Sequence, residues 1–368
     1  MKKRLVVFHP AIAPYRIDFF NTLHKDFDTS FYFEFKDALE QSFDQRILGE
    51  RLSFTPHYLN PGFAGIKNLR LDVWKILKAH KPDIAFISEY TILGILVLLY
   101  KFLVCPSLRI VITCDDNLRM AQSAGRIKRL TRSLLLRHVF AVLLVNTEVK
   151  DWYEKHLPYK ATYIYFPIIQ SDPLFKERLD KALPLTESLR QHYKLEQKKI
   201  FLYVGRLVAI KNIPLLLRFF DQIHKIDPDT ALFVVGDGES RNELQDQVKE
   251  LGLEHSAFLV GKKEGSELMA YYNLGDIFVL PSVYEPFGTV VNEALLAGCY
   301  VLCSSEAGAS CLIEDGVNGF RFDVEQPEEL LLAGKSLMEK VKHMDNKTNR
   351  MLFTYQDRID KVIQKINE

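Results

Sequence analysis

A strand, a helix and a second strand follow one another in residues 199–236, which read KIFLYVGRLVAIKNIPLLLRFFDQIHKIDPDTALFVVG. Residues 200–204 and 231–235 are short apolar runs rich in β-branched and aromatic side chains, which favour strands. Between them, apolar side chains recur at helical spacing from about Asn212. Two strands joined by a helix predict a parallel pair, because parallel strands need a long crossover connection.

The same alternation continues toward the C-terminus. It predicts strands at 257–260, 277–280 and 300–303, and helices at 240–251, 264–274 and 288–296. Two amphipathic helices are expected at the end of the chain, over 327–343 and 349–366.

The first half of the chain repeats this theme. We expect strands at 4–8, 83–88, 109–113 and 139–145, and helices at 16–25 and 68–80. The apolar stretch 91–104 is shorter than the roughly 20 residues that span a bilayer, so we interpret it as a buried helix. Residues 161–173 lose this alternation of strands and helices. Pro167, Pro173 and Pro184 punctuate a stretch that we interpret as a linker.

These elements predict an α/β protein with two facing, Rossmann-like, doubly wound domains. We place the domains at 1–185 and 186–348, and expect the last helix, within 349–368, to pack back on the first domain. A length of 368 residues supports two cores. Ligands of open parallel sheets bind beyond the carboxyl ends of the strands, so the cleft between the domains is the expected site.

Composition excludes several classes of protein. With 48% apolar and 26% charged residues, the chain is too apolar to be disordered. Its five cysteines form no CxxC pair, which indicates a reducing compartment. The first residues have no apolar core long enough for a signal peptide, so we expect a cytoplasmic protein.

The loop after the strand at 200–204 carries Gly205, Arg206 and Lys211. A glycine at the strand end lets the backbone approach a ligand, and the two cations suit a pyrophosphate. A solvated basic loop is an equally good interpretation of this loop alone.

The strand at 231–235 ends in Gly236 and Gly238, followed by Arg241. A dinucleotide fingerprint needs a third glycine where Arg241 stands, which argues against a Rossmann dehydrogenase. The turn either lets a donor approach the strand or has a purely structural role.

The most informative segment is residues 281–298, PSVYEPFGTVVNEALLAG. Glu285 lies in a loop after a strand, and Glu293 lies on the helix that follows. Between them, Gly288 and Thr289 stand where a helix N-terminus would present amide hydrogens to an anion. Either glutamate alone is better explained as a surface charge.

Taken whole, this segment resembles the E-x7-E signature of family 4 glycosyltransferases, which have the GT-B fold. The stretches VGRLVAIKN, VVGDGE, FLVGKKEGSELMAYYNLGDIFVLPS and EDGVNGF stand in the order usual for that family, over about residues 200–325. The resemblance implies a retaining enzyme that takes a sugar from a UDP- or GDP-sugar and needs no metal or other cofactor. It implies catalytic roles for Glu285, Arg206 and Lys211, and donor contacts for Gly205, Gly236, Gly238, Gly261, Lys262, Phe287, Gly288, Thr289 and Glu293.

The sequence departs from the family pattern in two places. The family's glycine pair followed by an acid becomes residues 307–311, AGASC, and Cys114 stands where many members have histidine. On the acceptor side, the strand ends of the first half offer polar side chains whose alternatives are structural, such as helix caps. These candidates are His9, Tyr15, Arg16, Glu89, Asp115 and Asp116.

Residues 119–137, RMAQSAGRIKRLTRSLLLR, contain six cations and no acid. Ile127, Leu130 and Leu134 recur among them at helical spacing, which is typical of a helix on an anionic membrane surface or of an ordinary solvated helix. Nucleic acid is not expected as a partner, because no recognition motif accompanies the cations.

We therefore expect a glycosyltransferase acting on a glycan or lipid-linked acceptor, in bacterial surface polysaccharide or lipopolysaccharide synthesis. The basic helix adds the expectation of a peripheral position on the inner face of the membrane. A nucleotide-sugar epimerase of the same architecture and a non-catalytic donor-binding or scaffold subunit are the alternatives. The base, the sugar and the linkage are not identified by the sequence.

Overall fold

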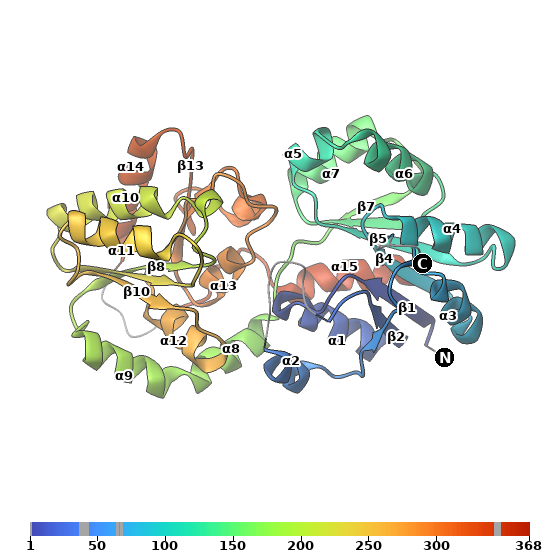
Figure 1. The fold of residues 1–368 in the computed structure, drawn as a ribbon, viewed down its shortest axis with the longest axis horizontal. Helices are drawn as coiled ribbons and strands as arrows, with labels where there is room; N and C mark the ends of the chain where they lie inside the picture. Colours follow the sequence, from blue (N-terminus) through green and yellow to red (C-terminus); the bar gives the residue numbers. More distant parts are fainter. Residues whose placement is uncertain (1, 37–43, 64–65, 67–68, 342–346) are drawn as a thin grey trace. The chain divides into compact units, whose positions relative to one another are not determined.

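The computed structural model describes residues 2–36, 44–63, 66, 69–341 and 347–368 (Figure 1). Its internal contacts divide the chain into two compact units. The first unit comprises Met1–Ile168 with Gln356–Glu368, and the second comprises Ile169–Tyr355.

The first unit is built on a seven-stranded sheet in which every described pairing is parallel. The strand order is β3-β2-β1-β4-β5-β6-β7, so the direction of winding reverses between β1 and β4. The strands are β1 (Arg4–His9), β2 (Asp28–Phe33), β3 (His57–Tyr58), β4 (Ile84–Ser88), β5 (Arg109–Cys114), β6 (Ala141–Leu144) and β7 (Thr162–Tyr165).

Helices of the first unit bury apolar side chains against this sheet. Val97 of α4 and Leu135 of α6 lie in one core cluster with Ile110 of β5 and Val142 of β6. The helices are η1 (Pro14–Arg16), α1 (Ile17–Asp26), α2 (Gln45–Arg51), α3 (Asp72–His80), α4 (Ile92–Leu103), α5 (Leu118–Gln122), α6 (Arg126–Leu136), α7 (Thr147–His156) and α15 (Tyr355–Asn367).

The terminal helix α15 contributes to the first unit. Its side chains Ile359, Val362 and Ile366 are buried, and Lys3 donates a hydrogen bond from its ammonium to the carbonyl of Asn367 at 2.8 Å. A helix far along the sequence is thereby fixed to the start of the chain.

The second unit has a six-stranded parallel sheet with the order β10-β9-β8-β11-β12-β13, which reverses between β8 and β11. Its strands are β8 (Lys199–Val204), β9 (Thr230–Val235), β10 (Ala257–Gly261), β11 (Ile277–Leu280), β12 (Tyr300–Ser304) and β13 (Gly319–Phe322). Its helices are α8 (Asp172–Lys181), α9 (Leu183–Tyr193), η3 (Ala209–Lys211), α10 (Ile213–Ile226), α11 (Arg241–Glu250), α12 (Gly265–Leu274), α13 (Val290–Leu296), η4 (Gly308–Leu312) and α14 (Pro327–Lys340).

The predicted α/β class with two doubly wound sheets is confirmed. The strands β2, β3, β7 and β13 were not predicted. Two predicted helix boundaries, Asn68 and His343, lie outside the described residues.

The linker expected at 161–173 is confirmed only for residues 166–171, which lie outside helices and strands and contain the division between the two units. Residues 162–165 form β7, and the helices α8 and α9 follow within the second unit, where the contacts place the division after Ile168. Pro173 and Pro184 lie in the first turns of these helices, where a proline costs no hydrogen bond.

The helix expected to be buried at 91–104 is buried on one face only. Leu93 and Val97 of α4 face the core, whereas Leu99 and Leu103 are exposed. No described helix combines the length and the apolar character needed to cross a bilayer.

Candidate active site

In each sheet the winding reverses between two neighbouring strands. The loops that follow these two strands run to opposite faces of the sheet. Ligands of open α/β sheets bind at such points. In the second unit these are the loops after β8 and β11, and in the first unit those after β1 and β4.

Lys211 and Glu285 meet at this point of the second unit. Lys211 ends η3 in the loop after β8, and Glu285 lies in the loop after β11. The two side chains form an ion pair and are only 12% and 14% exposed. The structure thus brings together two residues that are 74 positions apart in the sequence.

Arg206 lies in the same loop, and its carbonyl accepts a hydrogen bond from the hydroxyl of Tyr203 at 3.0 Å. Tyr203 is fully buried, and burial raises the pKa of its hydroxyl. This bond from the sheet core fixes the start of the cationic loop.

Glu293 on α13 is held by two hydrogen bonds that the sequence did not predict. The hydroxyl of Tyr272 donates to one carboxylate oxygen at 2.6 Å, and the side-chain amide of Gln170 donates to the other at 2.6 Å. Arg178 in turn donates to the side-chain oxygen of Gln170 at 2.8 Å. Burial and the Glu293 charge raise the pKa of Tyr272, so its hydroxyl stays a donor.

Packing accounts for two glycines that are expected to contact a donor. A Cβ on Gly236 would lie 1.8 Å from the carbonyl oxygen of Gly205, and one on Gly238 would lie 2.4 Å from that of Leu207. The loops after β8 and β9 approach so closely that side chains at these positions would clash. This is the structural alternative for that turn, and donor contact there stays a prediction.

The segment between the two glutamates contains one strained position. Gly288 has φ +93, where a side chain would be disfavoured and would lie 2.9 Å from Leu280. Thr289 precedes α13, whereas Phe287 is 3% exposed and packs in the core. The side chain of Phe287 is therefore explained by burial.

Gly261 and Lys262 follow one another at the end of β10. Gly261 has φ +79, and Lys262 forms an ion pair with Glu264 at 2.8 Å. The side chain of Lys262 is about half exposed, so it remains accessible to a ligand.

In the first unit, the loop after β1 meets the loop after β5. Arg16, which is buried, forms an ion pair with Asp115, and Tyr15 is half-buried beside it in η1. Burial and the neighbouring Arg16 lower the pKa of His9 to about 4, and its Nδ1 lies 2.9 Å from the carbonyl oxygen of Ala11. His9 is therefore neutral near pH 7.

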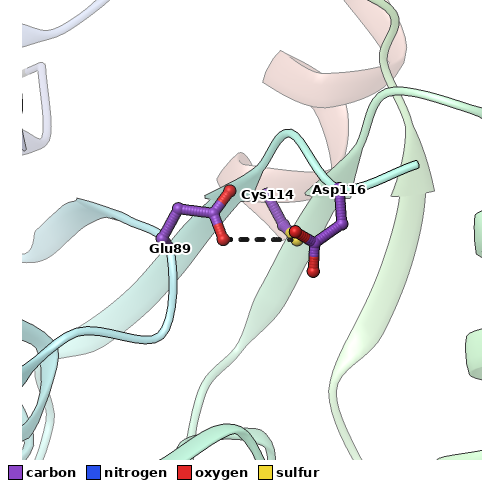
Figure 2. Close-up of side chains that lie close together, drawn as sticks. All are labelled: Glu89, Cys114 and Asp116. Atoms are coloured by element: carbon purple, nitrogen blue, oxygen red, sulfur yellow. Dashed lines mark hydrogen bonds between the residues drawn. The ribbon is translucent and has the colours of Figure 1, made fainter. Parts of the chain in front are cut away.

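A second cluster lies beyond β4 and β5, where Glu89, Cys114 and Asp116 converge (Figure 2). Glu89 has φ +58, an uncommon conformation for a non-glycine residue. One of its oxygens accepts the amide hydrogen of Asp115 at 2.7 Å, and the thiol of Cys114 lies 3.9 Å from the other. Burial and Asp116 raise the pKa of Glu89 to about 7.

The donor set of this cluster could bind a cation, and the chain itself supplies one. The ammonium of Lys128 lies 2.6 Å from Asp116 and 3.3 Å from Glu89. Burial raises the pKa of Cys114, so its sulfur is a protonated thiol rather than the thiolate that metals prefer. The interpretation of 119–137 as a helix whose cations face a membrane or solvent is therefore wrong for Lys128, and it is also wrong for Arg132, which is buried.

Comparison with known proteins matches residues 186–351 to the family model of "Glycosyl transferases group 1". An uncharacterized glycosyltransferase of Methanocaldococcus jannaschii is 36% identical over 37% of the chain and 34% of its own length. The lipopolysaccharide 1,2-N-acetylglucosaminetransferase of Salmonella typhimurium is 27% identical over 55% of the chain and 54% of its own length. The chain thus spans between a third and about half the length of these relatives.

Solved structures match over nearly the whole chain. HepE of Anabaena in complex with UDP superposes with a TM-score of 0.73 at 18% identity, covering 99% of this chain and 98% of that one. The lipopolysaccharide outer core galactosyltransferase WaaB superposes with a TM-score of 0.67 at 15% identity, over 99% of both chains. The protein therefore has the GT-B fold, and residues 186–351 of its second unit match the family model of group 1 glycosyl transferases.

Proposed function

We propose that the protein is a glycosyltransferase that moves a sugar from a nucleotide-sugar donor, held by the second unit, to a glycan or lipid-linked acceptor, held by the first. The observation that carries this proposal is the Lys211–Glu285 pair, which lies at the winding reversal of the second sheet and within the segment that matches glycosyl transferases. The relatives' names support transfer of a sugar. HepE structures with UDP and with UDP-glucose support a UDP-sugar as the first donor to try.

The chemistry assigned to the second unit follows from the charges at that point. Arg206 and Lys211 would stabilise the diphosphate as negative charge develops on it, which is electrostatic catalysis. Carboxylates accept hydrogen bonds only, so Glu285 and Glu293 would receive them from sugar and ribose hydroxyls. We propose transfer with retention and without a metal ion, as in the family that the sequence resembles.

The first unit supplies the proposed acceptor side. Asp115 is 40% exposed while its partner Arg16 is buried, so its carboxylate is both oriented and accessible. Such a group is suited to accept a hydrogen bond from an acceptor hydroxyl. The Salmonella relative supports a setting in surface polysaccharide or lipopolysaccharide synthesis.

A thermal-shift screen against UDP, GDP, ADP and their sugar conjugates tests the donor site. A ligand present at about 100 times its Kd stabilises the folded state by about 2.7 kcal/mol, so one nucleotide should raise Tm clearly. Glu293→Ala should abolish that rise. No shift with any nucleotide, at concentrations up to millimolar, would contradict the proposal.

A further inference from the structure

Two neighbouring helices of the first unit present large apolar side chains to solvent. On α6, Ile127 and Leu130 are 81% and 72% exposed, and on α4, Leu103 is 70% exposed. Apolar side chains gathered in this way mark a surface that binds something other than water. We name it the α4–α6 surface, formed by Leu99, Phe102, Leu103, Ile127, Leu130 and Leu134.

The two helices pack directly on each other (Figure 1). The hydroxyl of Thr131 on α6 donates to the carbonyl of Tyr90, just before α4, at 3.0 Å. The rings of Phe102 and His138 pack edge to face, with their centroids 4.8 Å apart. Leu135 and Leu136 of α6 fill the core, so the helix face that carries its exposed residues is turned outward.

The charges on α6 and on the residues beside it in the sequence have one sign. Residues 118–138 contain six cations and no acid. Lys128 points to the Glu89 cluster, and Arg132 is buried and donates to the carbonyl of Ala121 at 2.9 Å. The exposed cations are Arg119, Arg126, Arg129 and Arg137.

We propose that the α4–α6 surface docks onto an anionic lipid bilayer. Exposed leucine and isoleucine side chains interleaved with outward arginines suit the boundary between acyl chains and anionic headgroups. A second copy of the same surface would set arginines against arginines, which disfavours self-association. At 12 residues α4 is about 18 Å long, which is too short to cross a hydrocarbon core of about 30 Å, so docking leaves the helices at the membrane surface.

Helix α6 connects this surface to the cluster at the strand ends. Ile127 is exposed, and the next residue, Lys128, reaches Asp116 and Glu89. A lipid-linked acceptor embedded in the bilayer would therefore have its polar part near the proposed acceptor residues. This step rests on the proposed function, whereas docking itself does not.

Co-sedimentation of the full chain with vesicles tests the docking. Vesicles of phosphatidylcholine alone should bind weakly, and vesicles that also contain phosphatidylglycerol should bind strongly at low salt. The pair Arg126→Gln and Arg129→Gln should weaken binding by about fivefold for each cation. The pair Ile127→Ser and Leu130→Ser should weaken it by about tenfold or more for each side chain.

Matched controls lie in the second unit. Leu332 on α14 is 67% exposed and Arg218 on α10 is exposed, so Leu332→Ser and Arg218→Gln should leave binding unchanged. All substituted positions are exposed, and an unchanged Tm confirms folding.

Absence of binding to both vesicle types would overturn the proposal, as would equal losses in the controls. Binding that depends on the arginines but not on Ile127 and Leu130 would overturn insertion of the apolar side chains. A dimer in solution that Leu130→Ser dissociates would assign the surface to a second copy instead. Because nucleotide binding is measured separately, failure of docking and failure of the donor site are distinguishable.

Discussion

The two sheets share one topology but differ in the charges at the point where their winding reverses. In the second unit, Lys211 and Glu285 form one mostly buried pair. In the first unit, three acids, Glu89, Asp115 and Asp116, face Arg16 and Lys128. Burial and the neighbouring Asp116 raise the pKa of Glu89 to about 7. Burial lowers the pKa of Lys128, but the acids around it outweigh that effect and raise it.

The same sheet topology can therefore carry a site suited to an anion or a site suited to groups that donate hydrogen bonds. A site that contains cations suits a diphosphate, whereas an acid-rich site suits hydroxyl groups. The match to glycosyl transferases of group 1 covers the first kind of site and not the second. Four substitutions test this contrast between the two units.

Lys211→Ala should have the largest effect, because it removes a cation proposed to contact the diphosphate. We expect nucleotide affinity to fall by about 100-fold, as when one partner of a charge-assisted hydrogen bond is removed from a desolvated site. Isothermal titration calorimetry with the nucleotide found by the thermal-shift screen measures it. The exposed lysine variant Lys335→Ala is the control, and equal affinity in both variants would exclude Lys211 from the donor site.

Glu89→Gln should change how stability depends on pH. The pKa of the Glu89 carboxyl is 4.5 in the unfolded chain and about 7 in the folded state. Between these two pH values the carboxyl is protonated in the folded state and ionised in the unfolded chain. The unfolding free energy of the wild type should therefore decrease by about 2 kcal/mol as pH rises from 5 to 7, and that of the variant should not. Urea unfolding at both pH values measures the difference, and parallel pH dependence in the two proteins would contradict the raised pKa.

His9→Gln should have an effect of opposite sign and similar or slightly smaller size. The pKa of His9 falls from 6.5 to about 4 on folding, so its contribution is present above pH 6.5 and is lost as pH falls toward 4. As pH falls from 7 to 5, the unfolding free energy of the wild type should decrease by about 2 kcal/mol because of His9, and the variant should not show this decrease. The same titrations, with the exposed His255→Gln as control, would show no difference if His9 were protonated in the folded state.

Tyr272→Phe should have the smallest effect. It removes the hydrogen bond that orients Glu293 but leaves the carboxylate in place. Nucleotide affinity should fall by about tenfold, because a hydrogen bond to a charged acceptor contributes about 1.5 kcal/mol. Its neighbour Tyr271, also buried, provides the control Tyr271→Phe, and a lower Tm without a change in affinity would leave Tyr272 a purely structural role.

Local pattern sufficed for much of the fold. The strand at Ile277–Leu280 is predicted to the residue, and most other strands to within one or two, because buried parallel strands are continuous apolar runs. The missed strands have weaker patterns. β3 has two exposed residues, and β2 begins with three polar residues before its aromatic ones.

The sequence was enough to single out candidate site residues, but not to identify the distant side chains that contact them. Glu285 and Lys211 stand out in separate loops, but nothing in the sequence indicates that Tyr272 and Gln170 hold Glu293. Tyr272 has the spacing of a core residue on a helix, and Gln170 lies in the stretch interpreted as a linker. The sequence does not indicate that Lys128 points toward the strand ends, because the cations beside it on α6 are exposed.

Periodicity and residue type are local properties, so the two parallel sheets, the polar side chains at their carboxyl ends and the cationic helix could all be predicted from the sequence. Which of these side chains meet depends on the tertiary structure. Strand order brings β8 beside β11 and β1 beside β4, and that order depends on how distant segments bury their apolar faces together. The pKa of Glu89 and the exposure of the α4–α6 surface follow from the same packing, since burial and neighbouring charge exist only in the folded chain.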